Sequence, residues 1–528
     1  MRAADIIHTG RTSLGIELGS TRIKAVLIGE DHSVLANGSF SWENRLENNL
    51  WTYRLDDAVQ GLQESFADLA ADVRRRYGVE LTTIGAIGIS GMMHGYLALD
   101  KESRQLAPFL TWRNTNTSEA AGELTELFQF NVPLRWSISQ LYQAILNGEI
   151  HVPQIDYITT LAGYIHYLLT GRRVMGIGEA SGMFPIDSSI MDYDQTMLDQ
   201  FDALVAGREF SWKIRDILPT VLVAGQNAGH LTERGAKLLD SSGKLRPGIP
   251  MAPPEGDAGT GMVATNSVDA CTGNVSAGTS IFSMVVLERK LSRLYRDIDM
   301  VTTPSGRPVA MVHCNNGTSE LDAWTRMFGE ILTVVGADVS GGELYGILFH
   351  ESLNGSADCD DVTLFNYISG EPVTGLNDGR PLLVRRKDSK LTLANFMRSQ
   401  IYSIFASLAV GHRILEAEHV QIKRLTGHGG LFKTPDVAQK YLAAAMNAPV
   451  TVMKTAGEGG PYGMALLASY LLHARESTLE DYLENVVFGG VEGSTMEPET
   501  ADVTGYSAYL TAYCDALNLE HCAVKCVK

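Results

Sequence analysis

Apolar and polar positions near the N-terminal end of the chain first follow a strand-like pattern and then a helical one. Apolar residues recur every three or four positions over residues 55–77, which predicts a helix with one buried face that ends at Gly78. Another apolar run, over 84–89, predicts a buried strand after this helix. Three earlier apolar runs separated by polar turns predict consecutive strands, at 13–18, 23–28 and 34–40. This order predicts a mixed sheet with helices packed on it.

A similar pattern returns about half a chain later. Residues 273–277 and 281–287 predict two strands around a Gly-Thr-Ser turn, just as a Gly-Ser-Thr turn follows the first predicted strand. Elements expected further on are a helix at 391–412, a strand end at 424–427 and a helix at 435–446. The repetition predicts a duplicated domain. Because residues 241–256 are rich in proline and glycine, we expect an N-terminal domain at 1–262 and a C-terminal one at 263–528.

Length and cysteine content narrow the class of protein. A chain of 528 residues is too long to fold around a single hydrophobic core, which suggests two large domains, or three. It contains no uninterrupted apolar window of about 18 residues, so a membrane span is not expected. The first residues lack a secretory pattern, and the six cysteines lack paired CxxC spacing. These features favour a cytoplasmic protein without a metal cluster or disulfide framework.

The formal charge of −18 bears on partners. A surface this acidic repels nucleic acid and anionic membranes, so neither is expected as a partner. Phosphate binding remains open, because backbone amides at a glycine-rich turn can hold phosphate without a charged side chain.

Three glycine-rich turns are candidates for such binding. A Gly-Ser/Thr turn is also ordinary hairpin punctuation, but two of them at matching places in a duplicated fold favour a phosphate role. The third turn, near the C-terminal end, could pack against an adenine. None contains the P-loop pattern GxxxxGK[ST], which disfavours that class. The candidates are Gly19-Ser20-Thr21, Gly278-Thr279-Ser280 and Gly427-His428-Gly429-Gly430.

Side chains that could act on an alcohol lie at three places. Glu255 and Asp257 form a carboxylate pair at the expected domain joint, and phosphoryl transfer to an alcohol needs one carboxylate to accept the hydroxyl proton. An Asp that caps the following helix is the alternative. His94 follows a buried strand and could bind a sugar hydroxyl or be a half-buried histidine. Trp112 and Asn114 suit a sugar, although Trp112 could equally belong to the core.

Taken together, these motifs resemble the FGGY carbohydrate kinases over residues 13–472. The resemblance implies two duplicated actin-like (ribonuclease H-like) ATPase domains, an α/β fold. The N-terminal domain would bind sugar and the C-terminal domain nucleotide, with ATP and sugar meeting in the interdomain cleft.

The resemblance also implies a role for each motif. Residues 15–21 match the first phosphate motif, with Glu17 at the usual Asp position that helps to hold Mg²⁺. Gly278-Thr279-Ser280 matches the second phosphate motif, and Gly427, Gly429 and Gly430 belong to the adenosine motif. Residues 458–468 resemble the Gly/Ala-rich helix that closes the nucleotide site. Asp257 would be the catalytic base. Sugar contacts would come from Asp257, Met93, His94, Trp112 and Asn114, the last replacing the family's usual Asp.

The expected activity is transfer of phosphate from ATP, with Mg²⁺, to a ketopentose of the D-xylulose type, which would give the ketopentose 5-phosphate. L-Ribulose is the next candidate substrate, with glycerol and methylpentuloses behind. A different class, an actin-like sensor that binds ATP and sugar without transferring phosphate, is the alternative, and an intact Asp257 argues against it. Sugar and ATP are the expected partners, and a homodimer is compatible with the sequence.

Overall fold

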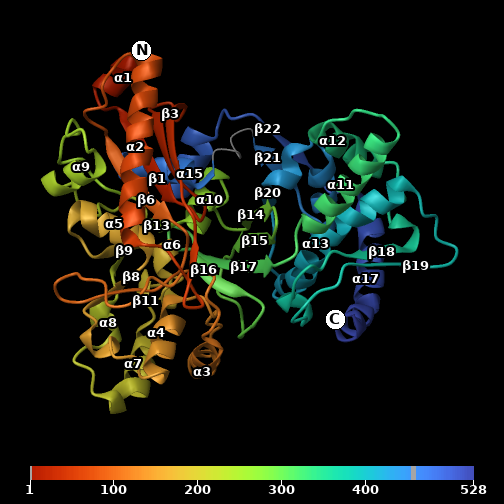
Figure 1. Ribbon diagram of the computed structural model, residues 1–528, viewed down its shortest axis with the longest axis horizontal. Helices are drawn as coiled ribbons and strands as arrows, with labels where there is room; N and C mark the ends of the chain where they lie inside the picture. Colours follow the sequence, from red (N-terminus) through yellow and green to blue (C-terminus); the bar gives the residue numbers. More distant parts are fainter. Residues whose placement is uncertain (1–2, 454–458, 528) are drawn as a thin grey trace.

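The computed structural model describes residues 3–453 and 459–527, which form two lobes side by side (Figure 1). The first lobe is built on a five-stranded sheet with the order β13-β6-β1-β2-β3. This order confirms the predicted mixed sheet, and the helix that follows β3 coincides with the predicted range. The strands of the sheet are β1 (Thr12–Leu18), β2 (Arg22–Gly29), β3 (Val34–Ser41), β6 (Ala86–Gly91) and β13 (Glu255–Gly256).

The second lobe contains a seven-stranded sheet with the order β16-β17-β15-β14-β20-β21-β22. Its central strand β14 pairs antiparallel with β15 and parallel with β20, just as β1 pairs antiparallel with β2 and parallel with β6. This correspondence confirms the predicted duplication. The strands are β14 (Thr272–Ala277), β15 (Ile281–Val286), β16 (Asp299–Thr302), β17 (Pro308–Cys314), β20 (Arg424–His428), β21 (Val450–Met453) and β22 (Gly493–Met496).

Helices cover both faces of the first sheet. Helices α2 (Leu55–Tyr77) and α5 (Leu161–Thr170) pack on one face, and Gly78 ends α2 in the left-handed conformation, as predicted. The other face is covered by α15 (Gly459–His473), which comes from the second half of the chain and lies in blue among the red strands of Figure 1. A side chain at Gly15 of β1 would overlap the backbone of α15, so the close packing requires glycine there.

Helix α10 (Asp257–Ala264) packs against α15 between the two sheets. One hydrophobic cluster runs from these two helices to apolar side chains of β15 and β17. The two lobes therefore share a continuous core, in which a helix from each half of the chain is embedded.

The remaining elements of the first lobe are short. Its other helices are α1 (Ala3–His8), α3 (Ser118–Phe128), α4 (Ser137–Leu146), α6 (Ile177–Ala180), α7 (Gln195–Val205), α8 (Ile214–Ile217) and α9 (Glu233–Leu239). Its two-stranded sheets pair β4 (Arg45–Glu47) with β5 (Leu50–Thr52), β7 (Leu97–Leu99) with β8 (Tyr157–Thr159), β9 (Val174–Gly176) with β12 (Thr220–Leu222), and β10 (Ile186–Asp187) with β11 (Asp192–Tyr193).

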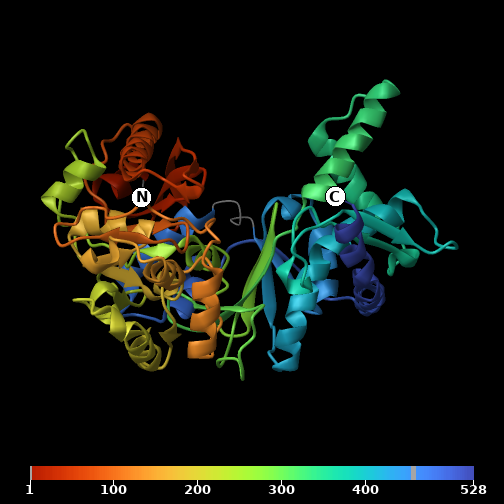
Figure 2. The same cartoon turned by 60° about the horizontal axis from the view of Figure 1, so that its bottom comes forward.

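In the second lobe, helices α13 and α14 pack beside the large sheet, and α11 and α12, drawn in green, project beyond the rest of the lobe (Figure 2). A small sheet pairs β18 (Val362–Phe365) with β19 (Leu382–Arg385). The helices from the second half of the chain, besides α15, are α11 (Ser319–Val334), α12 (Gly341–Ser352), α13 (Leu393–Ala417), α14 (Val437–Met446), α16 (Leu479–Asp481) and α17 (Thr500–Cys526).

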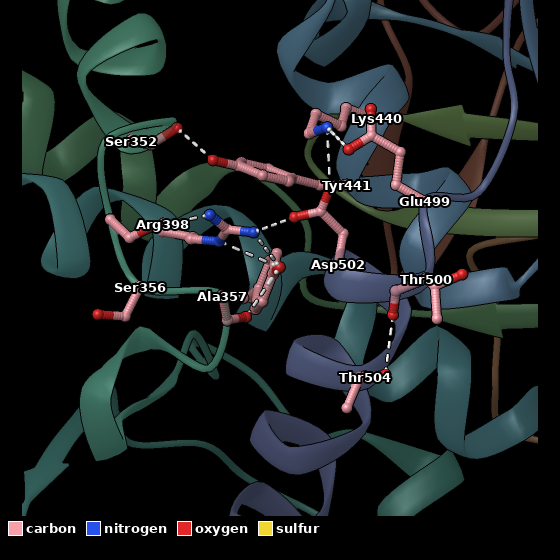
Figure 3. A network of polar contacts seen from close by, with 12 residues as sticks. Ser352, Ser356, Ala357, Arg398, Lys440, Tyr441, Glu499, Thr500, Asp502 and Thr504 are labelled. Atoms are coloured by element: carbon pink, nitrogen blue, oxygen red, sulfur yellow. Dashed lines mark hydrogen bonds and ion pairs between the residues drawn. The ribbon is translucent and has the colours of Figure 1, made fainter.

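A buried ion pair fastens α17 to α13 and α14 (Figure 3). The Arg398 guanidinium donates to Asp502 Oδ1 at 2.6 Å and to the hydroxyl of Tyr402. Lys440 adds a second cation at 2.8 Å from Asp502 Oδ2. Because both Arg398 and Asp502 are buried, each charge depends on the other for compensation. The C-terminal helix α17 is thus an integral part of the second lobe.

None of the helices in the described part of the chain is both long and apolar enough to cross a membrane. All six cysteines are free thiols, and three of them are buried: Cys271, Cys314 and Cys359.

Candidate active site

The turn between β1 and β2 is held from one side by two aromatic residues. Trp42 Nε1 donates to the Gly19 carbonyl at 2.7 Å, and the Tyr53 hydroxyl donates to the Ser20 carbonyl at 2.6 Å. The rings of Trp42 and Tyr53 stack on each other. In a trans peptide the next N–H points opposite to the carbonyl, so the amides of Ser20 and Thr21 point away from the aromatic pair. Two adjacent outward amides on an exposed turn form an arrangement that can receive a phosphate oxygen.

The turn between β14 and β15 is held in the same way, but by backbone amides instead of aromatic side chains. The carbonyl of Gly278 accepts a hydrogen bond from the Thr318 amide at 2.9 Å, and that of Thr279 accepts one from the Gly317 amide at 2.8 Å. The amides of Thr279 and Ser280 therefore also point outward. Both phosphate candidates consequently have their carbonyls bound on one side and their amides directed to the other.

The third glycine-rich turn lies beside the second one. Strand β20 runs parallel to β14, and a side chain at Gly429, whose φ is +101°, would overlap the carbonyl of Ala277. Only glycine fits this close approach and this conformation. The ring of Phe432 packs over Gly427, and a cavity of about 520 Å³ opens next to it, lined by Phe432, Pro435, Val452 and others. The second lobe therefore gathers two of the three predicted turns at one edge of its sheet.

Asp257 is the first residue of α10, and the helix cap is Gly256. The Asp257 side chain does not act as the cap: Oδ1 accepts the backbone amide of Met93 at 3.0 Å, across to the end of β6. The residue is open to solvent, while the protein packed around its carboxyl raises its pKa by desolvation. The residue is thus accessible, while one of its carboxylate oxygens is held by the protein.

Glu17, the last residue but one of β1, lies close to Asp257. Desolvation and the Asp257 carboxylate raise its pKa to about 8, and Lys24 opposite it on β2 acts in the other direction. Its carboxyl also packs against Gly460 at the start of α15, where a side chain would overlap it. A carboxyl group whose pKa is raised by a neighbouring carboxylate is stabilised in its ionised form by a cation close to it.

The fit of this pair to Mg²⁺ follows from its chemistry. Mg²⁺ prefers oxygen ligands and is commonly held by one or two carboxylates together with substrate phosphates. In the described part of the chain, groups of three or more His, Cys, Asp or Glu side chains arranged to hold a metal do not occur. Glu17, whose carboxyl lies close to Asp257, therefore suits a magnesium ion that arrives with a nucleotide.

His94 lies next to this carboxylate pair, and it is buried rather than half-buried. Its φ of +70° is in the left-handed region, which is uncommon for a residue other than glycine and concentrates at functional sites. The ring stacks on Trp136, and Nδ1 lies 3.3 Å from the carbonyl of Gly182. Desolvation holds the pKa of His94 well below its ordinary value, so the ring is neutral near pH 7.

Trp112 and Asn114 differ in their exposure to solvent. Trp112 is exposed, which excludes the core role, and the Arg113 guanidinium carbon lies 4.3 Å from the centre of the Trp51 ring and 5.8 Å from that of the Trp112 ring. Asn114 is buried: its Oδ1 accepts the Trp51 amide at 2.9 Å, and its Nδ2 donates to the carbonyls of Trp51 and Thr111. The side-chain amide thus positions the Trp51 backbone, and a contact between Asn114 and a sugar stays a prediction.

Several residues of the site had no signal in the sequence pattern. Trp42 and Tyr53 are remote from the turn that they hold. Glu179 lies in a stretch that resembles the family, residues 179–182, but no role was predicted for its side chain, which is buried beside Gly256. Gly317-Thr318 is different, because it is one more Gly-Thr pair that follows a strand and precedes a helix. Residue 458 of the expected nucleotide-closing segment lies outside the described residues, and 459–468 belong to α15.

Comparison with known proteins gives consistent matches over both halves of the chain. The N-terminal domain model of the FGGY family of carbohydrate kinases matches residues 12–263, and the C-terminal domain model matches residues 273–472. The xylulose kinase of Escherichia coli is 26% identical over 291 residues, which cover 53% of this chain and 55% of that enzyme, so this match spans about half of either protein. The xylulose kinase of Haemophilus influenzae is 20% identical over 523 residues and covers 94% of this chain and 98% of that enzyme.

Solved structures extend the likeness to the fold. A ligand-bound xylulose kinase from Lactobacillus acidophilus superposes with a TM-score of 0.78 at 16% identity, over 96% of this chain and 98% of that one. The Plasmodium falciparum glycerol kinase with ADP gives 0.75 at 14% identity, over 96% and 98% respectively. The expected duplicated actin-like fold is therefore confirmed, and with both domain models matched in order, the chain belongs to the FGGY family of carbohydrate kinases.

Proposed function

We propose that the protein transfers the terminal phosphate of ATP to a hydroxyl of a ketopentose, with D-xylulose as the leading substrate. The observation that carries the proposal is the position of Asp257. One carboxylate oxygen is fixed by the Met93 amide, beside the left-handed His94, while the residue remains open to solvent. A carboxyl held in this way can orient a sugar hydroxyl and accept its proton.

The protein's own groups would divide the work of the reaction. The outward amides of Ser20, Thr21, Thr279 and Ser280 would hold phosphate oxygens, since such transfer depends mainly on positioning and electrostatic stabilisation. Glu17 would hold Mg²⁺ with the nucleotide, and the ion would supply charge neutralisation on the phosphates. Asp257 would take the proton from the attacking hydroxyl.

The choice of sugar draws on His94 and on the relatives. A neutral, buried imidazole both donates and accepts one hydrogen bond, which suits a hydroxyl rather than a carboxylate. The two relatives described above are named xylulose kinases, whereas a rhamnulokinase and a gluconokinase also match, over 39% and 21% of this chain. Neutral ketoses, with D-xylulose before L-ribulose, are therefore our proposed substrate class.

An ADP-release assay over a panel of sugars tests the proposal. The panel contains D-xylulose, L-ribulose, L-rhamnulose, gluconate and glycerol, with ATP and Mg²⁺ in each reaction and a no-sugar blank. We expect the highest kcat/KM with a ketopentose. Highest activity with gluconate or glycerol would refute the substrate assignment, and ADP release that no sugar stimulates would favour the sensor alternative over a kinase.

A further inference from the structure

Two glutamates, Glu179 of α6 and Glu255 of β13, connect these two elements next to Asp257. From β13, Glu255 reaches α6, where its Oε1 accepts the Gly178 amide at 3.3 Å and its Oε2 accepts the Glu179 amide at 2.9 Å. From α6, Glu179 reaches back to β13 and packs so tightly on Gly256 that a side chain there would overlap its Oε2. These reciprocal contacts clamp the backbone step from which Asp257 projects.

The two glutamates are opposite in their hydrogen bonding. Both Glu255 oxygens accept backbone amides, whereas neither Glu179 oxygen has a hydrogen bond of regular geometry with any residue in 3–453 or 459–527. Glu179 is fully buried. Burial raises the pKa of Glu179 well above its ordinary value, and the neighbouring carboxyl groups of Asp257 and Glu255 act in the same direction. The Thr160 hydroxyl and the His94 amide face the carboxyl and lower its pKa, but they do not outweigh burial. A buried carboxyl with so little compensation is stable in its neutral form.

The same turn of chain also reaches His94. Gly182 follows Glu179 by three residues, and its carbonyl lies 3.3 Å from His94 Nδ1. A side chain at Gly182 would press on the imidazole ring. Residues 179–182 therefore contact Gly256, the residue before the proposed base, on one side and the proposed sugar-binding histidine on the other.

We propose that Glu179 is a positioning residue that works as a neutral carboxylic acid and sets where Asp257 and His94 stand. The inference rests on the proposed function, in which Asp257 is the base. Neutrality matters to that role, because a second negative charge beside Asp257 would favour the protonated form of the base. Glu179 does not touch the reacting atoms in this account and acts through its neighbours.

Three single variants test whether Glu179 acts in its neutral form or in its ionised form. Glu179→Gln keeps the shape and the neutral state, so we expect turnover within about threefold of wild type and an unchanged acid limb of the pH profile. Glu179→Ala removes the packing on Gly256, and we expect turnover to fall by at least about tenfold with little change in the KM for ATP. Glu255→Gln is the matched control: it places an amide donor opposite a backbone donor and should be impaired where Glu179→Gln is not.

A double-mutant cycle tests whether Glu179 acts through Asp257. Alanine at position 179 should cost clearly less turnover in the Asp257→Asn background than in wild type, because the group that it positions is already lost. The inference is wrong if Glu179→Gln is as impaired as Glu179→Ala while its melting temperature matches wild type, or if the two losses in the cycle are additive. An inactive wild type would refute the proposed function itself; an active wild type with an impaired Glu179→Gln refutes only the role of Glu179.

Discussion

Replacing Asp257 by asparagine tests the base directly, because the structure shows what the amide can and cannot reproduce. Oδ1 accepts the Met93 amide at 3.0 Å, and an asparagine oxygen can take the same place and keep this hydrogen bond. The second oxygen then becomes an NH₂ group, which donates and cannot accept a proton. The variant should therefore fold normally and lose only the base.

The expected loss follows from the usual contribution of a positioned base. A base of this kind contributes about 10²- to 10⁴-fold to turnover, which corresponds to about 2.7–5.4 kcal/mol of transition-state stabilisation. ATP affinity should stay near the wild-type value, because the Met93 contact is retained. Neutralising position 257 also removes one of the charges that raise the pKa of Glu17, so the Glu17 pKa should fall below about 8.

The pH profile supplies a second readout. Desolvation raises the pKa of Asp257, and a base works only when ionised, so wild-type kcat/KM should fall on acidification through a limb above the ordinary Asp value of about 3.9. This limb should disappear in Asp257→Asn. The assay is sugar-dependent ADP release between pH 4 and 9, with thermal melts as the folding control. A variant that keeps more than about a tenth of wild-type turnover, or the same acid limb, would show that another group is the base.

Four further substitutions probe other parts of the molecule. A side chain at Gly278 would meet open space and the backbone there is not left-handed, so Gly278→Val should keep the wild-type melting temperature in the absence of ligand. It should lose the stabilisation by ATP, which is about 2.7 kcal/mol at a hundredfold excess over Kd, and an ATP shift equal to that of wild type would contradict a phosphate role. Gly429→Ala should instead lower the melting temperature itself. Asn114→Asp turns a donor to two backbone carbonyls into an acceptor and should cost about 1–3 kcal/mol in urea unfolding, whereas unchanged stability would contradict this account. Burial raises the pKa of Glu371 from 4.5 to about 7, so its contribution to the free energy of unfolding is fully present below about pH 4.5 and is lost as the pH rises to about 7. Glu371→Gln should remove this part of the pH dependence between about pH 4.5 and 7, and parallel curves for the two proteins would refute it.

Local pattern predicted the central strands and helices well, because each of them buries one face and repeats with its own period. Helix α2 coincides with the predicted range, and the two Gly-Ser/Thr turns occupy equivalent places in the two sheets. Spacing of apolar residues says how an element is buried but not against what. It therefore could not show that α15 packs on the first sheet rather than the second.

The site was predictable where its chemistry lies in a short motif. Asp257 follows the proline- and glycine-rich segment expected at the domain joint, Met93-His94 follow a predicted strand, and the structure brings them together. The contact that Glu179 makes could not be found in this way, because its partner Gly256 is more than 70 residues away along the chain. Asn114 shows the converse: it lies in a motif that predicted a sugar contact, but its side-chain amide is hydrogen-bonded to the backbone of Trp51.

The origin of α15 in the second half of the chain has a consequence during synthesis. Strand β6 is complete at Gly91, but α15, the helix that covers one face of this strand, begins only at Gly459. At a translation rate of roughly 5–20 residues per second, this apolar face waits on the order of tens of seconds for its cover. The first lobe therefore cannot finish folding as it leaves the ribosome, and a nascent chain that stops between the two halves would present an unprotected sheet face to any other chain nearby.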